Sequence, residues 1–389
     1  MRDAGAKKTM VDPGDIIAEY HSFAALDTGG AEHITKPGVR GYPGLPAGIA
    51  LLRTRADIGG ERLLDATLTG GVLANEARER GHKGGVAVAE PSMAALRCAQ
   101  RALDGRDVEL SAGTSWYVPR QSFEHIYLAP ATDRGTARVE AELVGAHAAL
   151  AAGGNADIVM HKDQGAKRYE RFAKELFGHG EIVAKERGWR LVRLAKRIDE
   201  QHTVEPIEFE AAGLQLAAEP GVFAAGKLDP GTKLLLDTVD FGQLAGRRVL
   251  DLGCGYGILA LKASLAGAEV TALDDDLTAV RSTYANAMRY GLDVRCLHSD
   301  LDSALKQDES FDMVLTNPPF HVARQVQLPL SLAFLAVALK HLRQGGVMVL
   351  VANQALGYER YLAAWGDTSL LAAERGFKVL SVVNCRGPQ

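Results

Sequence analysis

The feature that most constrains the fold of this chain is an internal repeat. Short apolar runs alternate with longer amphipathic runs from about residue 62 to 197, and the alternation resumes from about 247 to 385. Four stretches recur in the same order about 190 residues apart, beginning with RLLDATLTGG at 62–71 and RVLDLGCGYG at 248–257. Such alternation is typical of β-α-β units around a parallel sheet. Its ordered repetition predicts two similar α/β domains.

Domain boundaries follow from this repeat. At 389 residues the chain has room for two domains. We expect an N-terminal leader over 1–53, a first α/β domain over 54–200 and a second over 201–389. The residues up to about Gly38 have mixed charge and little periodicity, so we expect them to be partly loose. The stretch KPGVRGYPGLP at 36–46 is rich in Pro and Gly and should be loop.

Composition excludes several classes of protein. The formal net charge is −4, so a surface for nucleic acid would have to be a local patch. One candidate is 161–197, with 11 Lys and Arg against 5 Asp and Glu, although a solvated helix surface with ordinary ion pairs is nearly as good an explanation. The cysteines are scattered and Cys254 has no base beside it, so we predict no disulfide, metal site or cysteine nucleophile. No apolar run reaches about 18 residues, so we expect no membrane span and a cytoplasmic location.

A glycine-rich loop in the second repeat is the first chemical motif. A strand pattern at 249–252 leads into GCGYG, with Gly253, Gly255 and Gly257, and then into an apolar helical pattern. Glycines at such a turn permit positive φ and let the backbone approach a ligand closely. Dinucleotide folds show GxGxxG, whereas this loop is GxGxG with Asp251 just before it, which is similar to motif I of class I methyltransferases. An acid there suits the amine of S-adenosylmethionine; a dinucleotide loop and a plain βα turn are the alternatives.

Acidic residues after the next two strand patterns are the second motif. Asp274 comes about 20 residues after the glycine loop, where a carboxylate can accept hydrogen bonds from both ribose hydroxyls. Its neighbours Asp275 and Asp276 suit the start of the next helix, and Asp275 is also a candidate cofactor contact. Asp300, followed by Leu301, lies where methyltransferases often place an acid against the adenine amino group; a solvated loop Asp is the alternative.

The third motif is NPPF, formed by Asn317, Pro318, Pro319 and Phe320 directly after the strand pattern FDMVLT. Open α/β sheets bind ligands at this edge. An exocyclic amino group on a base is a poor nucleophile because its lone pair is delocalised into the ring. The Asn317 side-chain oxygen and the Pro318 carbonyl can accept its two hydrogens, while the prolines keep the loop rigid. Phe320 can stack on the base. The motif therefore predicts methylation of an amino group; a stiff loop without chemistry is the alternative.

The first repeat lacks this chemistry. It has lost the glycine pattern of its first loop, and it carries Ala129-Pro130-Ala131 at the position of the catalytic motif. We therefore expect the first domain to be degenerate and to serve RNA binding or stability, and the second to be the working catalytic domain.

The C-terminal half resembles the bacterial rRNA guanine-N2 methyltransferases that carry two tandem methyltransferase-like domains, the small-subunit enzyme and its large-subunit sister. The resemblance covers about 220–385 and rests on DLGCGYG, Asp274, NPPFH and an entry segment that begins at Gly221. Adenine and glutamine methyltransferases usually show Tyr after the prolines, whereas Phe followed by His321 favours the guanine-N2 group. The N-terminal match is weaker and rests on the repeat and YLAPATDRG. The residues matching the segment that closes over the methionine end of the cofactor are Lys227, Asp229, Gly231 and Thr232.

The resemblance implies two tandem class I (Rossmann-like) methyltransferase domains and S-adenosylmethionine as cofactor. It implies N2 methylation of a guanine in 16S rRNA by an enzyme, most simply a monomer, that binds rRNA or a ribosomal subunit. The alternatives are a 23S rRNA enzyme, an adenine-N6 or protein-glutamine methyltransferase, and a non-catalytic RNA-binding assembly factor. The candidate cofactor contacts are Lys227, Asp229, Gly231, Thr232, Asp251, Gly253, Cys254, Gly255, Gly257, Asp274, Asp275, Asp300, Leu301 and Asn317; the candidate catalytic residues are Asn317, Pro318, Pro319 and Phe320; the candidate substrate contacts are Phe320 and His321.

Overall fold

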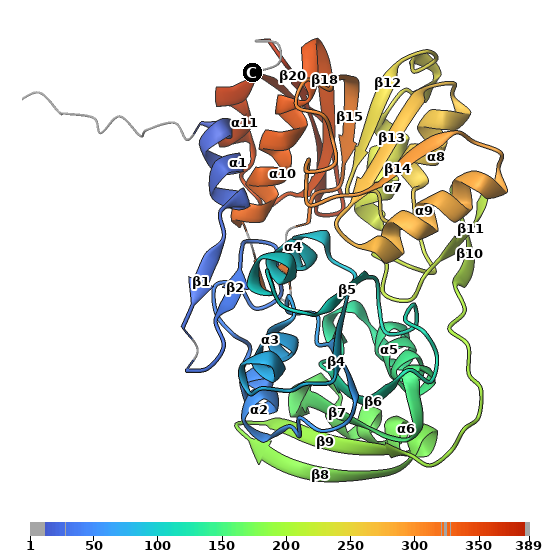
Figure 1. Cartoon of the computed structure of the whole chain (residues 1–389). Helices are drawn as coiled ribbons and strands as arrows, with labels where there is room; N and C mark the ends of the chain where they lie inside the picture. Colours follow the sequence, from blue (N-terminus) through green and yellow to red (C-terminus); the bar gives the residue numbers. More distant parts are fainter. Residues whose placement is uncertain (1–11, 28, 320, 323–324, 327, 386–389) are drawn as a thin grey trace, which may run out of the picture.

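The computed structural model describes residues 12–27, 29–319, 321–322, 325–326 and 328–385. Figure 1 shows two domains, one above the other, each built on a seven-stranded sheet. The strands of the N-terminal sheet are β3 (Arg62–Ala66), β4 (Gly85–Glu90), β5 (Glu109–Ala112), β6 (Phe123–Leu128), β7 (Leu150–His161), β8 (Gly178–Glu186) and β9 (Trp189–Lys196). Those of the C-terminal sheet are β12 (Arg248–Leu252), β13 (Glu269–Asp274), β14 (Val294–His298), β15 (Phe311–Thr316), β18 (Leu342–Asn353), β19 (Asp367–Glu374) and β20 (Phe377–Val383).

The two sheets have the same topology. Their orders are β5-β4-β3-β6-β7-β9-β8 and β14-β13-β12-β15-β18-β20-β19. In each sheet the first five strands of the order are parallel, and the last two pair antiparallel. The sequence repeat is thus a repeat of the whole fold, and the predicted α/β class with two similar domains is confirmed.

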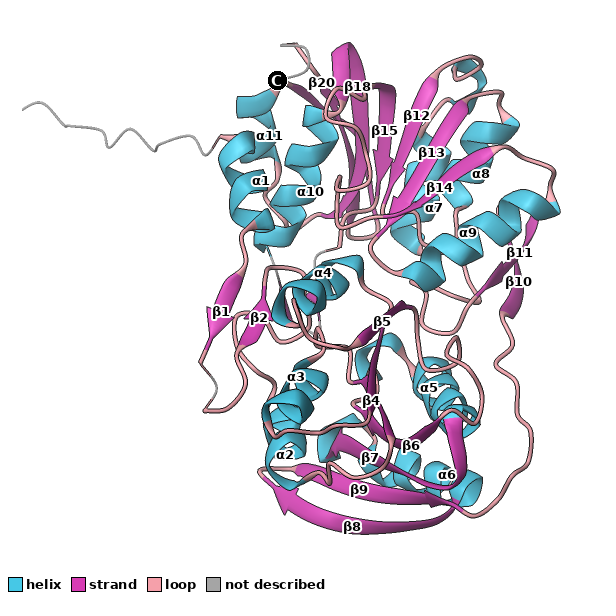
Figure 2. Cartoon of the chain, viewed as in Figure 1, coloured by secondary structure: helices cyan, strands magenta, loops and turns pink. Residues whose placement is uncertain are grey.

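Helices cover both faces of each sheet (Figure 2). They are α1 (Pro13–His21), α2 (Ala47–Arg55), α3 (Val72–Glu79), α4 (Met93–Ala102), α5 (Thr136–Ala149), α6 (Ala166–Phe177), α7 (Pro230–Thr238), α8 (Ile258–Leu265), α9 (Leu277–Arg289), α10 (Leu328–Lys340) and α11 (Glu359–Trp365). In the C-terminal sheet, Leu250 and Leu252 of β12 pack into the cluster under α10, and Val249 packs into the one under α8. A strand buried on both faces needs a continuous apolar run, which is why VLDL reads as a strand. Within the described ranges, no helix has the length and apolar character that a membrane span needs.

The remaining strands form three two-stranded ribbons. They are β1 (Ala24–Leu26) with β2 (His33–Thr35), β10 (Ile207–Ala211) with β11 (Leu214–Ala218), and β16 (His321–Val322) with β17 (Gln325–Val326). The expected boundary between residues 200 and 201 lies between β9 and the second ribbon.

In its described residues the leader is folded onto both domains. Helix α1 packs against α10, and its Ile16 and Tyr20 belong to the C-terminal core. Strand β2 packs on α4, and α2 packs on β7 and β9 of the N-terminal domain. The expected boundary between residues 53 and 54 therefore falls inside α2. This segment is held by apolar contacts with residues far away in the sequence, and such contacts leave no periodic pattern in the segment itself.

The domains meet through equivalent segments. The Met93 N–H donates to the Asp275 carbonyl (2.8 Å), and the Leu277 N–H donates to the Pro91 carbonyl (2.9 Å). Met93 and Leu277 are the first residues of α4 and α9, which follow the equivalent strands β4 and β13. This reciprocal pair gives the interface a local pseudo-twofold symmetry, as in an isologous dimer contact. It brings the carboxyl end of β4 against the carboxyl end of β13.

Candidate functional site

The glycine loop lies between β12 and α8. Gly255 and Gly257 have φ of 58° and 90°, in the left-handed region that glycine tolerates best. A Cβ added at Gly257 would lie 2.8 Å from Cγ2 of Thr283 on α9, whereas one added at Gly255 would have no heavy atom within 4 Å. The loop is therefore pressed against α9 on one side and open on the other, as the approach of a ligand requires.

Asp251 lacks a donor that its counterpart in the first repeat has. Its Oδ2 accepts a hydrogen bond from Ala260 N (2.9 Å), while Oδ1 is buried and has no partner among the described residues. The equivalent Asp65 accepts at Oδ1 from both the backbone N (3.0 Å) and the Oγ1 (2.6 Å) of Thr67. Burial raises the pKa of Asp251 to about 7. A buried carboxylate oxygen without a donor is costly, so the site fits a ligand that brings an N–H donor, such as the ammonium group of S-adenosylmethionine.

Asp274 is held ready at the end of β13. Its Oδ2 accepts from Gly255 N (3.0 Å) and its Oδ1 from Asp276 N (2.9 Å). In the first repeat Glu90 likewise accepts two backbone hydrogen bonds, from Gly70 N of the first loop and from Ser92 N, each at 3.2 Å. Asp274 is half-buried, but Glu90 is 1% exposed, and burial raises its pKa to about 8. A carboxylate has about four acceptor positions, so Asp274 can still receive ligand hydroxyls where Glu90 cannot.

Asn317 is oriented by residues of the entry segment. Its Nδ2 donates to Thr232 Oγ1 (3.0 Å) and to Asp229 Oδ2 (3.3 Å). Because a carboxylate only accepts hydrogen bonds, the nitrogen must face Asp229. Among the described residues none donates to the Asn317 oxygen, which can therefore accept from a ligand. Asp229 itself begins α7, where its Oδ2 accepts from Thr232 N (2.8 Å). The entry segment thus fixes the amide in the orientation that recognition of an amino group requires.

Asp275 and Asp276 serve the domain interface. Asp276 begins α9, as expected, and accepts from Thr278 N (2.8 Å). It also pairs with Arg134 of the N-terminal domain, whose charge helps to hold the pKa of Asp276 below its ordinary value in spite of burial. Asp275 Oδ1 accepts from Ala94 N of α4 (2.8 Å). Asp275 thus takes part in the domain contact, and its contact with the cofactor stays a prediction.

Asp300 is the centre of an ion-pair cluster that its sequence context does not reveal. It is fully buried, its Oδ1 accepts from Tyr20 (2.9 Å), and both oxygens lie 2.7 Å from Lys36 Nζ. Arg97 Nη1 donates to its Oδ2 at 2.6 Å. Burial would raise the pKa of Asp300, but the hydrogen bonds from His21, Lys36 and Tyr20 hold it well below its usual range. The solvated-loop alternative is thus wrong, and the adenine contact stays a prediction.

His21 makes the stability of this cluster dependent on pH. Its Nε2 lies 3.1 Å from Asp302 Oδ1, and its Nδ1 lies 3.7 Å from Asp300 Oδ2. Burial lowers the pKa of His21, but the hydrogen bonds to these two carboxylates outweigh burial and raise it above the ordinary value. Because the pKa of His21 is higher in the folded than in the unfolded protein, its contribution to stability is fully present at pH values below the unfolded-state pKa of about 6.5. This contribution is lost as the pH rises through the folded-state pKa.

We expect His21→Gln to lower the free energy of unfolding more near pH 5.5 than near pH 8, because only protonated His21 pairs with the two carboxylates. Urea unfolding at both pH values measures this, with the exposed His202→Gln as the matched control. An equal loss at both pH values would contradict the charged role of His21.

The other predicted site residues take varied positions. Cys254 is buried, accepts from Thr283 Oγ1 (3.3 Å) and has a pKa that burial raises well above its ordinary value, so a thiolate nucleophile is disfavoured. Leu301 is 2% exposed within the C-terminal core. Lys227 is exposed, and its carbonyl accepts from the Tyr256 hydroxyl (3.2 Å).

Four further predicted site residues are packed against the surrounding elements, and two predictions fall outside the described residues. A Cβ added at Gly231 would lie 3.0 Å from Phe377, and one at Gly253 would lie 3.2 Å from Phe334. The Pro319 carbonyl accepts from Ser331 Oγ (2.6 Å), and Pro318 beside it is buried. Phe320 and the side chain of His321 lie outside the described residues.

Sequence reasoning missed the polar residues that support the glycine loop from α9. Thr283 Oγ1 donates to the Gly255 carbonyl (3.0 Å), and Asn286 Nδ2 donates to the Tyr256 carbonyl (2.9 Å). Both side chains are fully buried. Their spacing of three along the helix places them on one face, a signal that was available in the sequence.

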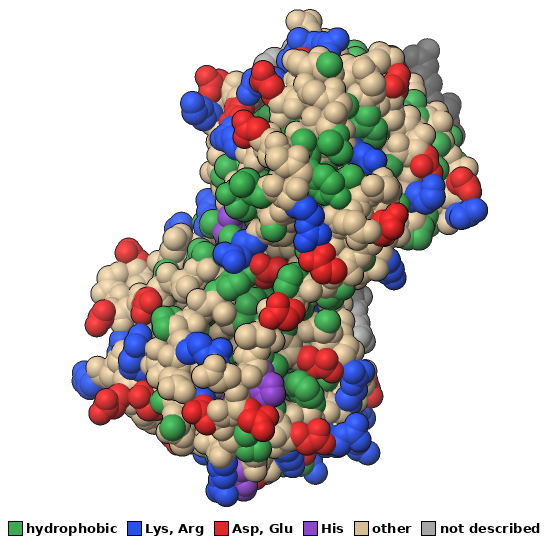
Figure 3. All heavy atoms as spheres, turned by 90° about the vertical axis from the view of Figure 1, so that its right-hand side faces the viewer, with side chains coloured by type: hydrophobic (Ala, Val, Ile, Leu, Met, Phe, Trp, Pro, Cys, Tyr) green, Lys and Arg blue, Asp and Glu red, His purple; other side chains and the backbone are tan. Residues whose placement is uncertain are grey.

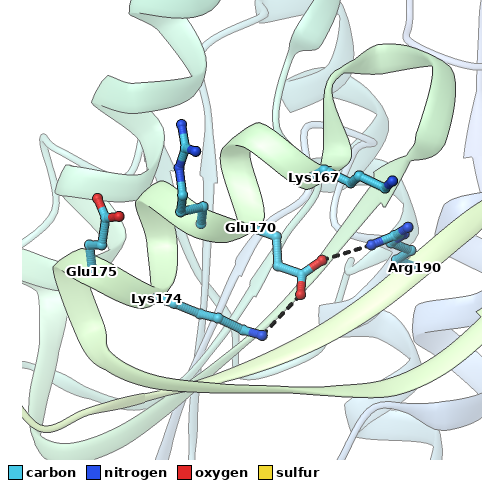
Figure 4. A pocket seen from close by; sticks show the side chains of 6 residues that line it. Lys167, Glu170, Lys174, Glu175 and Arg190 are labelled. Atoms are coloured by element: carbon cyan, nitrogen blue, oxygen red, sulfur yellow. Dashed lines mark hydrogen bonds and ion pairs between the residues drawn. The ribbon is translucent and has the colours of Figure 1, made fainter.

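The basic stretch at 161–197 forms part of the lower domain in Figure 1. Figure 4 shows a shallow pocket there, in which Glu170 pairs with Lys174 (2.9 Å) and Arg190 (3.0 Å). In the described part of the chain, Lys167 and Arg171 of α6 have no acidic partner within 4.0 Å. On the face seen in Figure 3, acidic and basic side chains are interspersed over this domain. The arrangement favours a solvated surface over a strong phosphate-binding stripe.

Comparison with known proteins agrees with this geometry. The family model for the methyltransferase small domain matches residues 31–193 and again 213–381. A ribosomal RNA small subunit methyltransferase C of Chromohalobacter salexigens is 41% identical over 181 residues, which are 46% of this chain and 54% of that protein. The chain thus spans about half the length of the first such relatives. The Pseudomonas entomophila protein of the same name is 32% identical over 67% of this chain and 80% of its own length.

One solved structure covers nearly the whole molecule. It is the T. thermophilus 16S rRNA N2 G1207 methyltransferase in complex with AdoMet and guanosine, with a TM-score of 0.84 and 35% identity. The match covers 95% of this chain and 99% of that one. The similarity therefore includes both domains and most of the leader.

Proposed function

Because this chain belongs to the methyltransferase small-domain family, with two tandem class I (Rossmann-like) domains, we propose that it methylates the exocyclic N2 amino group of a guanine in 16S rRNA. The observation that carries the proposal is the orientation of Asn317, whose amide nitrogen is held by Thr232 and Asp229. Its oxygen, together with the Pro318 carbonyl, is then available to accept the two hydrogens of an amino group.

The cofactor site of the second repeat fits S-adenosylmethionine. Asp251 Oδ1, which has no donor among the described residues, would accept a hydrogen bond from the ammonium group of the cofactor. The remaining acceptor positions of Asp274 would bind the ribose hydroxyls. The open side of the loop at Gly255 would let the cofactor lie close to the backbone. When bound, S-adenosylmethionine supplies a methyl group already activated on a sulfonium. The protein then has to bind, orient and exclude water, and positioning supplies most of the rate enhancement.

Asn317 and Pro318 would act on the amino group itself. Accepting its two hydrogens favours a pyramidal nitrogen and directs the lone pair toward the methyl carbon. The added positive charge on nitrogen is relieved by loss of a proton, which an ammonium-like product gives up to water without a strong base. Stacking by Phe320 and contact by His321 remain predictions.

The choice of guanine in 16S rRNA rests on the relatives. The similar proteins bear the name of small-subunit rRNA methyltransferase C, and the T. thermophilus structure was determined with guanosine. We expect a cytoplasmic protein that acts as a monomer.

Transfer of labelled methyl groups tests the proposal. Purified 30S subunits, 50S subunits and free 16S rRNA from a strain lacking the enzyme would be incubated with the protein, and the modified nucleosides would be identified. We expect N2-methylguanosine in 16S rRNA. Label in N6-methyladenosine, in 23S rRNA or in protein would overturn the substrate and leave the cofactor site intact.

We expect Asp274→Ala to weaken S-adenosylmethionine binding by about 10- to 100-fold, because hydrogen bonds to a charged group contribute about 1.5–3 kcal/mol. Calorimetric titration measures the affinity. Asp237→Ala, which removes an exposed carboxylate paired with Lys233 on α7, is the matched control and should leave affinity unchanged. Unchanged affinity in Asp274→Ala would mean that the ribose is held elsewhere.

A further inference from the structure

The degenerate domain keeps the backbone of the catalytic loop. Strand β6 pairs with β3 so that Leu128 lies opposite Ala66, and β15 pairs with β12 so that Thr316 lies opposite Leu252. The next residues are Ala129-Pro130 in the first domain and Asn317-Pro318 in the second. The carbonyls of Ala129 and Pro130 therefore lie at the sheet edge where the second domain presents its acceptors for the amino group.

A side chain of the leader occupies this edge. Arg40 Nη1 donates to the Ala129 carbonyl (2.5 Å), and Nη2 donates to the Pro130 carbonyl (3.1 Å), which also accepts from Thr132 N (2.9 Å). The guanidinium is planar and has a rigid fork of N–H donors. Guanine has the same group in its N1–H and N2 amino donors, which share the carbon C2. Arg40 thus presents to the degenerate loop two neighbouring donors of one planar group, as the N1–H and N2 amino donors of a guanine edge would.

The same stretch of leader binds the active domain. Lys36, four positions before Arg40, is fully buried with its Nζ 2.7 Å from Asp300 Oδ1. Val39, between them, is also fully buried. Residues 36–40 therefore connect the loop of the degenerate domain to the cluster at the end of β14. Arg40 binds the loop, and Lys36 binds Asp300 in the cluster.

We propose that the loop at Ala129-Pro130 is a guanidinium-binding site whose built-in occupant is Arg40, and that it accepts a free guanidinium compound or a guanine edge when Arg40 is removed. The proposal that this loop binds a guanidinium group rests only on the contacts of Arg40. The likeness to guanine rests on the proposed function of Asn317-Pro318.

Chemical rescue tests this inference. Arg40→Ala should lower the thermal midpoint of the full chain by about 3–10 °C, because two hydrogen bonds from a charged group are lost. Millimolar methylguanidinium chloride should restore part of the loss in this variant, by binding the folded state only, whereas tetramethylammonium chloride at the same concentration should not. Guanosine should raise the midpoint of Arg40→Ala by more than it raises that of the wild type, in which only the active domain is free to bind it.

The matched control is Arg62→Ala, which removes an arginine of the same domain that lies over the Phe123 ring and pairs with Glu109. Methylguanidinium should give no selective rescue there. If Arg40→Ala does not fold, Arg40→Lys keeps the charge without the fork and should show the same rescue. If methylguanidinium rescues Arg40→Ala no better than Arg62→Ala, the guanidinium site is refuted. If methylguanidinium rescues Arg40→Ala and guanosine does not, the likeness to guanine is refuted. Neither readout depends on methyl transfer, so a wrong proposed function would leave both measurements valid.

Discussion

Replacing Asn317 with Ala should lower kcat for methyl transfer by about 10²–10³-fold, the range for removal of one preorganised hydrogen-bonding group at a reacting centre. The affinity for S-adenosylmethionine should stay within a few-fold, because Asn317 is assigned to the amino group and the cofactor is assigned to Asp251 and Asp274. Single-turnover transfer to 30S subunits and calorimetric titration of the cofactor measure the two quantities separately.

Two further variants define the role of Asn317. Asn353→Ala is the matched control, since that Asn accepts from Ala355 N in a turn after β18 and should not affect kcat. Asn317→Asp should be as inactive as Asn317→Ala, because it would place a second carboxylate beside Asp229 and lose the donor that orients the side chain. Loss of cofactor affinity equal to the loss of kcat in Asn317→Ala would contradict the assigned role.

The second large effect is on stability. Asp300→Ala should lower the free energy of unfolding by about 3–5 kcal/mol, because it leaves the buried Lys36 ammonium without its partner. Arg97 and Tyr20 lose an acceptor at the same time. Urea unfolding measures the loss, and Asp237→Ala, an exposed pair with Lys233, should cost at most about 0.5 kcal/mol.

A double variant separates the lone charge from lost packing. Adding Lys36→Met to Asp300→Ala removes the uncompensated cation and should recover part of the loss. If the double variant were less stable than Asp300→Ala by the full cost of Lys36→Met alone, the two residues would not be coupled, and the importance of this pair would be refuted.

Several parts of the fold and site could be predicted because their determinants are local. The alternation of apolar and amphipathic runs gave both sheets, since a buried parallel strand and its crossover helix each need their own apolar period. Asp251, the glycine loop, Asp274 and Asn317 could be assigned as candidates because each directly follows or ends a strand. Parallel strands bring their carboxyl ends to one edge of the sheet, so position along the chain already implies position in space.

Partners across the molecule could not be predicted. The sequence of 300–301 does not indicate that Asp300 binds Lys36, 264 positions away, because the choice of an ion-pair partner depends on which groups are buried together. The packing of α1 on α10 has the same origin: a nine-residue amphipathic helix carries no signal of the surface it covers. The hydrogen bond from Ala94 of the other domain to Asp275 is a further contact that the sequence around Asp275 does not indicate.

The sequence by itself determined that the chain is a duplicated α/β fold and that only the second copy carries the candidate cofactor and catalytic motifs, because apolar periodicity and strand-end residues are properties of short segments. Only the tertiary structure decided how the copies are joined and used. It joined the starts of α4 and α9, put the leader across both domains, and placed Arg40 on the degenerate loop. It also left Asp251 Oδ1 without a donor among the described residues, where Asp65 has Thr67. These are contacts between distant segments, and their free energy depends on burial and on geometry that exist only once the chain has folded.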